Sequence, residues 1–350
     1  MTATEPRQLT FCCTVNRTLV HRDSLGEVFL TDLHTDGDDG YAVAAMLPRS
    51  HSYYGDHLLR PAMYDPLLLL ETSRQACLAG AHAFFDVPLG DKFVLTFLRI
   101  SLIRPELLTV GSQPLRLTMK VTVTDRRVRD GRVSGLDSAL ELSVDGTVVG
   151  WTGVGLRFRN ARSYAELRAA NRDGKPLPSS AELPAEPTRN LVAPHLVGRA
   201  LPGNVILTDA TGDNGDAYAA LHVPPAHPSL FDHAQDHLPG MVLTEAARQL
   251  ALFAALEARG LSPAKAFPSD IYVVFTRFGE LEPPTSLAAK VGAPDAGVRQ
   301  HAETFYTQGG PLELPEESGR PHTELPVTVT AWQEEKELAT CSITLATRTD

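Results

Sequence analysis

Apolar and polar residues alternate along many stretches of the chain, with the two-residue period of strands that bury one face. This pattern predicts an early group of strands at 27–31, 40–47, 93–105, 115–125, 138–144 and 147–158. It predicts a later group at 204–208, 216–223, 271–283, 326–332 and 339–347. Each group is interrupted by one long segment that lacks the alternation and is apolar on nearly every side.

These two segments predict long helices at 66–85 and 240–260, with Pro66 and Gly240 marking their starts. A helix that is apolar all round has to be enclosed by the rest of the protein. One long helix followed by an antiparallel run of strands is typical of the α+β class. We therefore expect an α+β fold in which a sheet wraps each helix.

The two groups are copies of each other, because four sequence blocks recur in the same order at offsets of 174 to 178 residues. VFLTD at 28–32 matches VILTD at 205–209, and PRSHSYYGDH at 48–57 matches PPAHPSLFDH at 224–233. LETSRQ at 70–75 matches TEAARQ at 244–249, and Phe97, Arg99 and Pro105 match Phe275, Arg277 and Pro283. A repeat of this length indicates duplicated domains. We expect an N-terminal domain at 1–159, a linker at 160–200 and a C-terminal domain at 201–350.

Two segments lie outside the repeated elements. The linker combines a predicted short helix at 162–171 with DGKPLPSSAELPAEP, which is rich in Pro and Ser. TQGGPLELPEESGRPH at 307–322 predicts a long loop within the second domain.

Composition narrows the class of protein. The 350 residues carry 42 acidic and 32 basic side chains, a formal charge of −10, which argues against a nucleic-acid binder. No apolar run approaches the roughly 18 residues of a membrane span, and the start has no signal-peptide pattern. The four cysteines include no Cys-x-x-Cys pair, which argues against a zinc site and a disulfide framework. We expect a cytoplasmic protein.

Charged side chains on the two apolar helices are the candidates for chemistry. Glu245, Arg248 and Gln249 share one helix face, and Glu71 and Arg74 repeat the pattern in the first copy. Burial raises the pKa of a carboxylate and an adjacent arginine lowers it, so the pair predicts a general base poised near neutral pH. Arginine also suits a phosphate or carboxylate group of a substrate. A plain structural ion pair is the alternative.

The entry to the second helix is the other candidate. The backbone N–H groups of the first turn, at Gly240 and Met241, are placed to hold a carbonyl oxygen or an anion. His237 precedes that turn and is expected to contact substrate. The histidines upstream are expected to fix the loop by hydrogen bonds and not to bind a metal. The chain has no P-loop and no dinucleotide-binding loop, so no cofactor is expected.

Two stretches resemble the A-factor biosynthesis (AfsA-type) proteins of actinomycetes. One contains PRSHSYYGDH and YDPLLLLETSRQ within 48–75, and the other is HPSLFDHAQDHLPGMVLTEAARQ at 227–249. VHRDSLGEVFLTD at 20–32 and VGRALPGNVILTD at 197–209 are weaker matches. The resemblance implies a tandem of two hotdog domains, similar to β-hydroxyacyl dehydratases and acyl thioesterases. In such a domain an antiparallel sheet wraps a long helix.

The resemblance also implies an activity. A β-ketoacyl group would pass from acyl carrier protein to the hydroxyl of dihydroxyacetone phosphate. The ester would then cyclise to a butenolide phosphate, leading to γ-butyrolactone or furan signalling molecules that switch on antibiotic production. The residues that match the family's proposed site are Glu71, Glu245 and Arg248. The first copy departs from the family pattern, because Tyr64-Asp65-Pro66 replaces the His-x-Pro-Gly entry.

This resemblance suggests a mechanism in which Glu245 takes the proton of the acceptor hydroxyl. The N–H groups near Gly240 and Met241 would hold the developing charge, and Arg248 would orient Glu245 or bind phosphate. No covalent intermediate or redox cofactor is required. Two alternatives stay open, namely an acyl-thioester hydrolase or dehydratase and a non-catalytic acyl or lactone sensor. The chain is expected to be a monomer in which the two copies mimic a dimer, or a homodimer.

Overall fold

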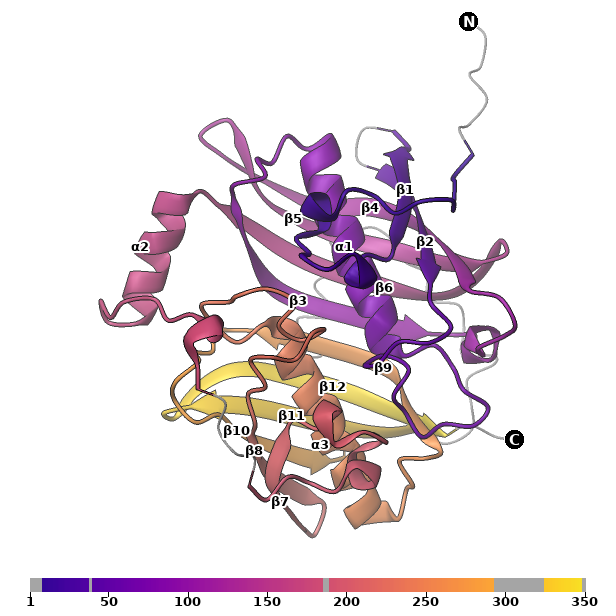
Figure 1. Ribbon diagram of the computed structural model, residues 1–350, viewed down its shortest axis with the longest axis vertical. Helices are drawn as coiled ribbons and strands as arrows, with labels where there is room; N and C mark the ends of the chain where they lie inside the picture. The colour runs from indigo at the N-terminus through magenta and orange to yellow at the C-terminus, as the bar shows by residue number, and fades with distance from the viewer. Residues whose placement is uncertain (1–7, 38–39, 185–188, 293–323, 348–350) are drawn as a thin grey trace, which may run out of the picture.

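The computed structural model of the protein describes residues 8–37, 40–184, 189–292 and 324–347 (Figure 1). Within these residues twelve strands form one continuous antiparallel sheet. The first half contributes β1 (Leu30–Thr35), β2 (Gly40–Leu47), β3 (Lys92–Leu102), β4 (Leu115–Arg129), β5 (Arg132–Val144) and β6 (Thr147–Arg159). The second half contributes β7 (Leu207–Asp213), β8 (Asp216–Leu221), β9 (Ala266–Phe275), β10 (Ser286–Val291), β11 (Glu324–Gln333) and β12 (Lys336–Thr347).

The strand order repeats about the centre of the sheet. It runs β1-β2-β4-β5-β6-β3 and continues β9-β12-β11-β10-β8-β7. Read from its outer edge, the second half has the order of the first, so β3 and β9 are equivalent strands. They pair antiparallel at the seam, with Phe97 opposite Val274 and Ser101 opposite Asp270. The duplicated sequence therefore forms two equivalent halves related by an approximate twofold axis.

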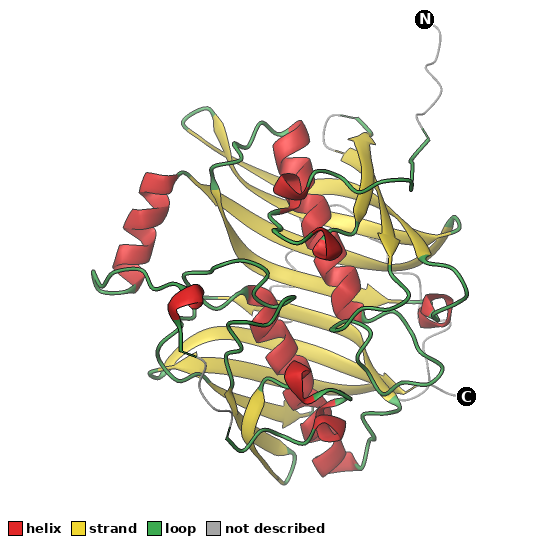
Figure 2. Ribbon diagram, viewed as in Figure 1, coloured by secondary structure: helices red, strands yellow, loops and turns green. Residues whose placement is uncertain are grey.

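Each half contains one long helix, α1 (Pro66–Phe84) or α3 (Gly240–Arg259). Both helices lie on the same face of the sheet (Figure 2), and each packs against strands of its own half. Nearly every side chain of their first four turns is buried, as the all-round apolar pattern predicts. The α3 helix ends at Gly260, whose φ of 64° provides the left-handed C-cap.

The linker helix α2 (Ala161–Asn171) lies at the side of the molecule and is tied to the second half (Figure 1). Arg168 is fully buried and donates hydrogen bonds of 2.6 and 2.9 Å to the two carboxylate oxygens of Glu280. Arg172 pairs with Glu280 and with Glu282. Ion pairs therefore hold the first part of the linker against the second half. The domain boundaries at 159 and 200 stay a prediction.

Most of the predicted elements are present, and the differences have physical causes. β2 and the start of α3 fall where the pattern placed them. The strand predicted at 271–283 ends at Phe275, because the chain beyond it turns its glutamates toward the arginines of α2. The six-residue strand β10 was missed because its alternation is too short to stand out. The loop predicted at 307–322 lies outside the described residues.

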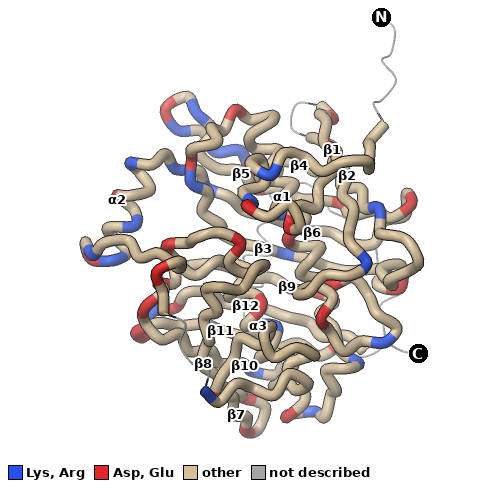
Figure 3. The backbone as a smooth tube through the Cα atoms, viewed as in Figure 1, with Lys and Arg blue, Asp and Glu red and all other residues tan. Residues whose placement is uncertain are grey.

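Charge is spread over the molecule. Acidic and basic positions are interspersed in the view of Figure 3, and the tube shows no single basic face on that side. None of the helices in the described ranges is long and apolar enough to cross a membrane.

The contact between α1 and β2 gives a test of this packing. A Cβ atom at Gly80 would lie 2.3 Å from the ring of Tyr41, so Gly80→Ala forces the two elements apart. We expect a fall of about 1–3 kcal/mol in the free energy of unfolding from overpacking, although alanine is the better helix former by about 1 kcal/mol. Urea denaturation measures the free energy of unfolding of the variant and of the wild type.

The control is Gly90→Ala, because a Cβ there meets no atom within 4 Å. This variant should stay within about 0.5 kcal/mol of the wild type. Equal stability of both variants would contradict the close approach of α1 to β2.

Candidate active site

Glu245 on α3 is completely buried and held by two arginines. Its Oε1 accepts hydrogen bonds from Arg199 Nη2 at 2.8 Å and from Arg248 Nη2 at 2.7 Å. Gln249, one turn further along α3, also donates to this carboxylate, and its own Oε1 accepts the backbone N–H of Ile206 at 3.0 Å. The helix, its carboxylate and the segment that enters β7 are therefore joined by one hydrogen-bond network.

The first half repeats this network around Glu71, which is also fully buried. Arg22 Nη2 lies 2.6 Å from Glu71 Oε1, and Arg74 Nε lies 2.8 Å from Oε2. Gln75 donates to Glu71 and accepts the backbone N–H of Phe29 at 3.1 Å. Each half therefore holds a carboxylate between an arginine of its own helix and an arginine that precedes its first strand.

Both carboxylates stay ionised. Burial acts to raise the pKa of Glu71 and of Glu245, but the two arginines around each outweigh burial and lower the pKa from 4.5 to about 2. The expected pKa near neutral pH is therefore wrong for these side chains, whereas their role in the reaction stays a prediction. Burial and an adjacent arginine act on each pKa in opposite directions, as predicted. However, each carboxylate has two arginines beside it, and the spacing along the helix indicated only one.

The two halves form an open cavity on one side of their interface. It has a volume of about 570 Å³, and its lining comes from both copies. The first half contributes Arg22, Arg74 and Lys92, and the second half contributes His237, Gly240 and Met241. The first turn of α3 thus opens into the same space as the arginines that hold Glu71.

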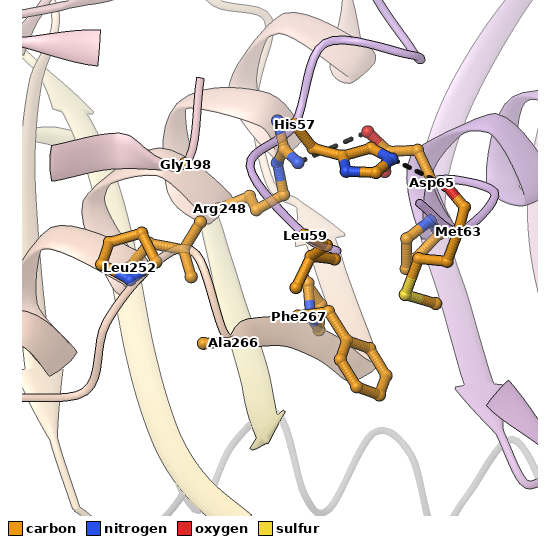
Figure 4. Close-up of a pocket in the computed structure, with 12 residues that line it drawn as sticks. His57, Leu59, Met63, Asp65, Gly198, Arg248, Leu252, Ala266 and Phe267 are labelled. Atoms are coloured by element: carbon orange, nitrogen blue, oxygen red, sulfur yellow. Dashed lines mark hydrogen bonds and ion pairs between the residues drawn. The ribbon is translucent and has the colours of Figure 1, made fainter. Parts of the chain in front are cut away.

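The equivalent place on the other side of the interface is almost filled, and we call it the closed pocket; Figure 4 shows residues that line it. Here the pocket has a volume of only about 10 Å³ and is lined by Asp65 and His57 of the first half and by Arg248 and Gly198 of the second. Asp65 Oδ2 lies 3.4 Å from Arg248 Nη1. The side chain of Asp65 therefore stands between the start of α1 and the arginine of α3.

His237 is oriented at the edge of the open cavity. Its Nδ1 donates a hydrogen bond to Asp236, and Asp236 also accepts the hydroxyl of Tyr164 at 2.8 Å. Arg168 of α2 donates to the backbone carbonyl of Asp236 at 2.8 Å. Burial opposes ionisation of Asp236, but the hydrogen bonds from His237 and Tyr164 lower its pKa below 3.8. An ionised carboxylate thus fixes the imidazole ring and leaves Nε2 available for proton transfer.

The structure brings together some of the predicted site residues and separates others. Arg74, His237, Gly240 and Met241 line the open cavity. Arg248 lines the closed pocket instead, so it does not share a space with the first turn of its own helix. Glu71 and Glu245 lie beneath the arginines and line neither of these two pockets.

Several side chains of this site were not found by sequence reasoning. Arg22 and Arg199 stand at the same place in the repeat, 177 residues apart, and this offset was the available signal. Tyr164 lies in the linker and has no counterpart in the repeat, so nothing in the sequence connected it with Asp236.

Among the loop histidines of the second half, His227 fixes the backbone, as predicted. His227 Nδ1 accepts the backbone N–H of Ser229 at 3.2 Å and that of Leu230 at 3.1 Å. No cluster of three or more His, Cys, Asp or Glu side chains that could hold a metal ion occurs in the part of the chain that the structure describes.

Comparison with known proteins identifies the family. The model of the A-factor biosynthesis hotdog domain matches residues 3–158 and 181–309. 2-Oxo-3-(phosphooxy)propyl 3-oxoalkanoate synthase from Streptomyces virginiae is 36% identical over 293 residues, which cover 82% of this chain and 91% of the relative. The synthase of the same name from Streptomyces griseus is 33% identical over 312 residues, with coverages of 83% and 92%. The chain belongs to the A-factor biosynthesis hotdog family.

Membership in the A-factor biosynthesis family confirms the resemblance drawn from the motifs, and the fold is a tandem of two hotdog domains. Among solved structures, the pyran synthase domain from module nine of the sorangicin pathway is similar. Its TM-score is 0.49 at 14% identity, over 92% of this chain and 98% of that one.

Acid unfolding tests the buried carboxylates of this family member. Because the pKa values of Glu71 and Glu245 are lowered from 4.5 to about 2, their ion pairs contribute fully above pH 4.5. This stability is lost as the pH falls from about 4.5 toward 2. We expect the free energy of unfolding, measured in urea between pH 7 and pH 3, to fall over that window. Glu245→Gln should lower the free energy of unfolding at pH 7 by about 3–5 kcal/mol, because it leaves buried arginines unpaired. In this variant the free energy of unfolding should also fall less steeply below pH 4.5.

Glu257→Gln, on the exposed side of the same helix, is the matched control. It should leave the pH dependence of the free energy of unfolding unchanged. If the free energy of unfolding of Glu245→Gln falls below pH 4.5 as steeply as that of the wild type, this carboxylate is not the titrating group.

Proposed function

We propose that this protein is an acyltransferase that joins a 3-oxoacyl thioester to dihydroxyacetone phosphate. The product would be the 2-oxo-3-(phosphooxy)propyl 3-oxoalkanoate named in its relatives, which are up to 36% identical over most of both chains. The observation that carries the proposal is the open cavity, where arginines of one half face an oriented histidine of the other. Such a site supplies both a proton acceptor and positive charge for a phosphorylated acceptor.

In the proposed reaction His237 Nε2 takes the proton from the acceptor hydroxyl. The oxygen attacks the thioester carbonyl, a C–O bond forms, and the C–S bond breaks. The imidazolium then returns the proton to the leaving thiolate, so atoms and charge balance without a cofactor. Asp236 supports this role because its carboxylate holds the ring through Nδ1 and stabilises the imidazolium.

Negative charge at the site is offset by the groups around it. Arg74 and the first turn of α3, at Gly240 and Met241, line the cavity and provide positive potential. We propose that Glu71 and Glu245 act by holding the arginines and do not act as bases. Their burial and their pKa of about 2 support this assignment. The family resemblance implies instead that Glu245 is the base, and the variants below decide between the two roles.

The ester has a route to a cyclic product. The CH₂ between its two carbonyl groups is acidic and can attack the ketone of the triose unit, and loss of water then gives a butenolide phosphate. We propose this sequence as the entry to γ-butyrolactone or furan signalling molecules that regulate antibiotic production. We also propose acyl carrier protein as the acyl donor and a monomer of two halves, or its homodimer, in the cytoplasm.

The assignment is tested by mass spectrometry of the purified protein with a 3-oxoacyl thioester and dihydroxyacetone phosphate. The wild type should form the phosphorylated ester or its butenolide. His237→Asn should lower the turnover number by roughly 10²–10⁴-fold, the usual contribution of general acid–base catalysis. Asp236→Asn should move the pH profile of turnover, which a structural role alone would not do.

The matched control is His195→Asn, an exposed histidine that does not line the cavity, and it should keep wild-type turnover. Free acid released at the same rate without the acceptor would identify a thioester hydrolase. If folded Glu245→Gln loses a hundredfold while His237→Asn stays within tenfold, the base is Glu245 and the proposed proton path is wrong.

A further inference from the structure

The two long helices differ at the residue that caps their start. Asp65 is the N-cap of α1, and its Oδ1 accepts the backbone N–H of Leu67 at 2.9 Å. Pro239 is the N-cap of α3 and supplies no side-chain hydrogen bond. The N–H groups of a first helical turn have no partner within the helix, so the start of α3 lacks the anionic group that satisfies the start of α1.

The closed pocket shows what such an anion does in this fold. One oxygen of Asp65 caps α1, and the other lies 3.4 Å from Nη1 of Arg248 on the other long helix (Figure 4). Within the repeat, α3 corresponds to α1 and Arg74 corresponds to Arg248. The open cavity therefore contains the same pair of elements, a helix start and an arginine, but with a proline in place of the carboxylate.

Arg22, at the wall of the open cavity, is less fully paired than its counterpart in the other half. Its counterpart Arg199 uses all three nitrogens, with Nε and Nη2 on Glu245 and Nη1 on the carbonyls of Tyr53 and Asp56. Arg22 is 8% exposed and lines the open cavity, yet its Nε is buried with no hydrogen-bond partner among the described residues. Arg22 thus makes fewer hydrogen bonds than its counterpart, although its unpaired Nε is buried and does not face the cavity.

The other charges that face the cavity sharpen the choice of ligand. Lys92 is exposed at its wall. Three of the carboxylates there are already engaged: Asp23 with Arg17, Asp232 with backbone N–H groups, and Asp236 with His237. Asp91 is the fourth carboxylate of the lining. Arg22 and Arg74 share the single charge of Glu71, so the pair keeps one net positive charge. A neutral carbonyl oxygen would use two N–H groups at most, whereas this charge, Lys92 and the helix start favour an anion such as phosphate.

We propose that the open cavity binds a phosphate group between the first turn of α3 and Arg74, in the position that the Asp65 carboxylate occupies in the closed pocket. Lys92 and Arg22 complete this phosphate site. The inference rests on the proposed function, because the phosphorylated acceptor of that reaction is the ligand it fits. It also explains why one pocket is open: the closed one carries its own anion.

The test introduces into the open cavity the N-cap carboxylate that the closed pocket has. Pro239→Asp places a carboxylate at the N-cap of α3, as Asp65 does on α1, and Pro239→Ala removes the proline without adding charge. Binding of glycerol 3-phosphate, which cannot be acylated to the keto ester, is measured by calorimetry at low salt. We expect Pro239→Asp to weaken binding more than tenfold and Pro239→Ala to stay within threefold. An N-cap aspartate stabilises a helix, so Pro239→Asp should remain folded, which circular dichroism checks.

A second variant removes a positive charge that β3 contributes to the cavity. Lys92→Met, at the start of β3, should weaken binding about three- to tenfold and reduce its dependence on salt. Arg129→Gln, at the exposed end of β4, is the matched control and should bind as the wild type does. The proposal is overturned if Pro239→Asp binds glycerol 3-phosphate and phosphopantetheine, a second phosphate probe, both as tightly as the wild type does. Equal loss in Pro239→Asp and Pro239→Ala also overturns it.

The source of the phosphate is distinguished by repeating the titration with phosphopantetheine. Loss of glycerol 3-phosphate binding alone in Pro239→Asp assigns the site to the acceptor, and loss of phosphopantetheine binding alone assigns it to the arm of the acyl carrier. Both outcomes support a phosphate site. Turnover is scored separately: binding without ester formation leaves the site standing and rejects the acyltransferase, whereas ester formation by a Pro239→Asp variant at the wild-type rate rejects the site.

Discussion

The buried ion pair between a helix glutamate and two arginines is the interaction on which both halves depend. A carboxylate with no exposed surface is costly unless its charge is matched, and Glu245 is matched by Arg248 of its own helix and by Arg199. Arg199 also donates to backbone carbonyls of the loop that precedes α1 in the other half. The network thus joins the helix, the segment before its first strand and the opposite copy. Separating the two copies would remove the carbonyl partners of Arg199 Nη1 and break the contact between Arg248 and Asp65.

The two halves contain two such networks, and small differences between them give the two sides of the interface different shapes. On one side Asp65 caps a helix, pairs with Arg248 and leaves about 10 Å³ of space. On the other side the cap is Pro239, and a cavity of about 570 Å³ remains. His237 and Asp236 belong to this open side, and Tyr164 from the linker holds them there. The linker helix therefore supports the candidate site as well as connecting the halves.

The architecture was predictable from the sequence because it rests on local periodicity and on the repeat. Two all-round apolar helices and alternating strands gave the α+β fold, and the offset of about 176 residues gave two equivalent halves. The candidate site was predicted only in part. Spacing on one helix placed Glu245 and Arg248 together, but it did not show that a second arginine would lower the pKa of that carboxylate. Nor did it show that Arg248 and the start of its own helix face different pockets, because that depends on how the two halves pack.

The proposed chemistry takes place in one cavity built from both halves. The most direct measurement is a crystal structure with glycerol 3-phosphate and a 3-oxoacyl pantetheine amide, which resembles the thioester but cannot transfer its acyl group. We expect one copy of each ligand per chain, with the acceptor hydroxyl near His237 Nε2 and the phosphate between Arg74 and the first turn of α3. Ligand bound beside Asp65 and Arg248, with the open cavity empty, would contradict the account.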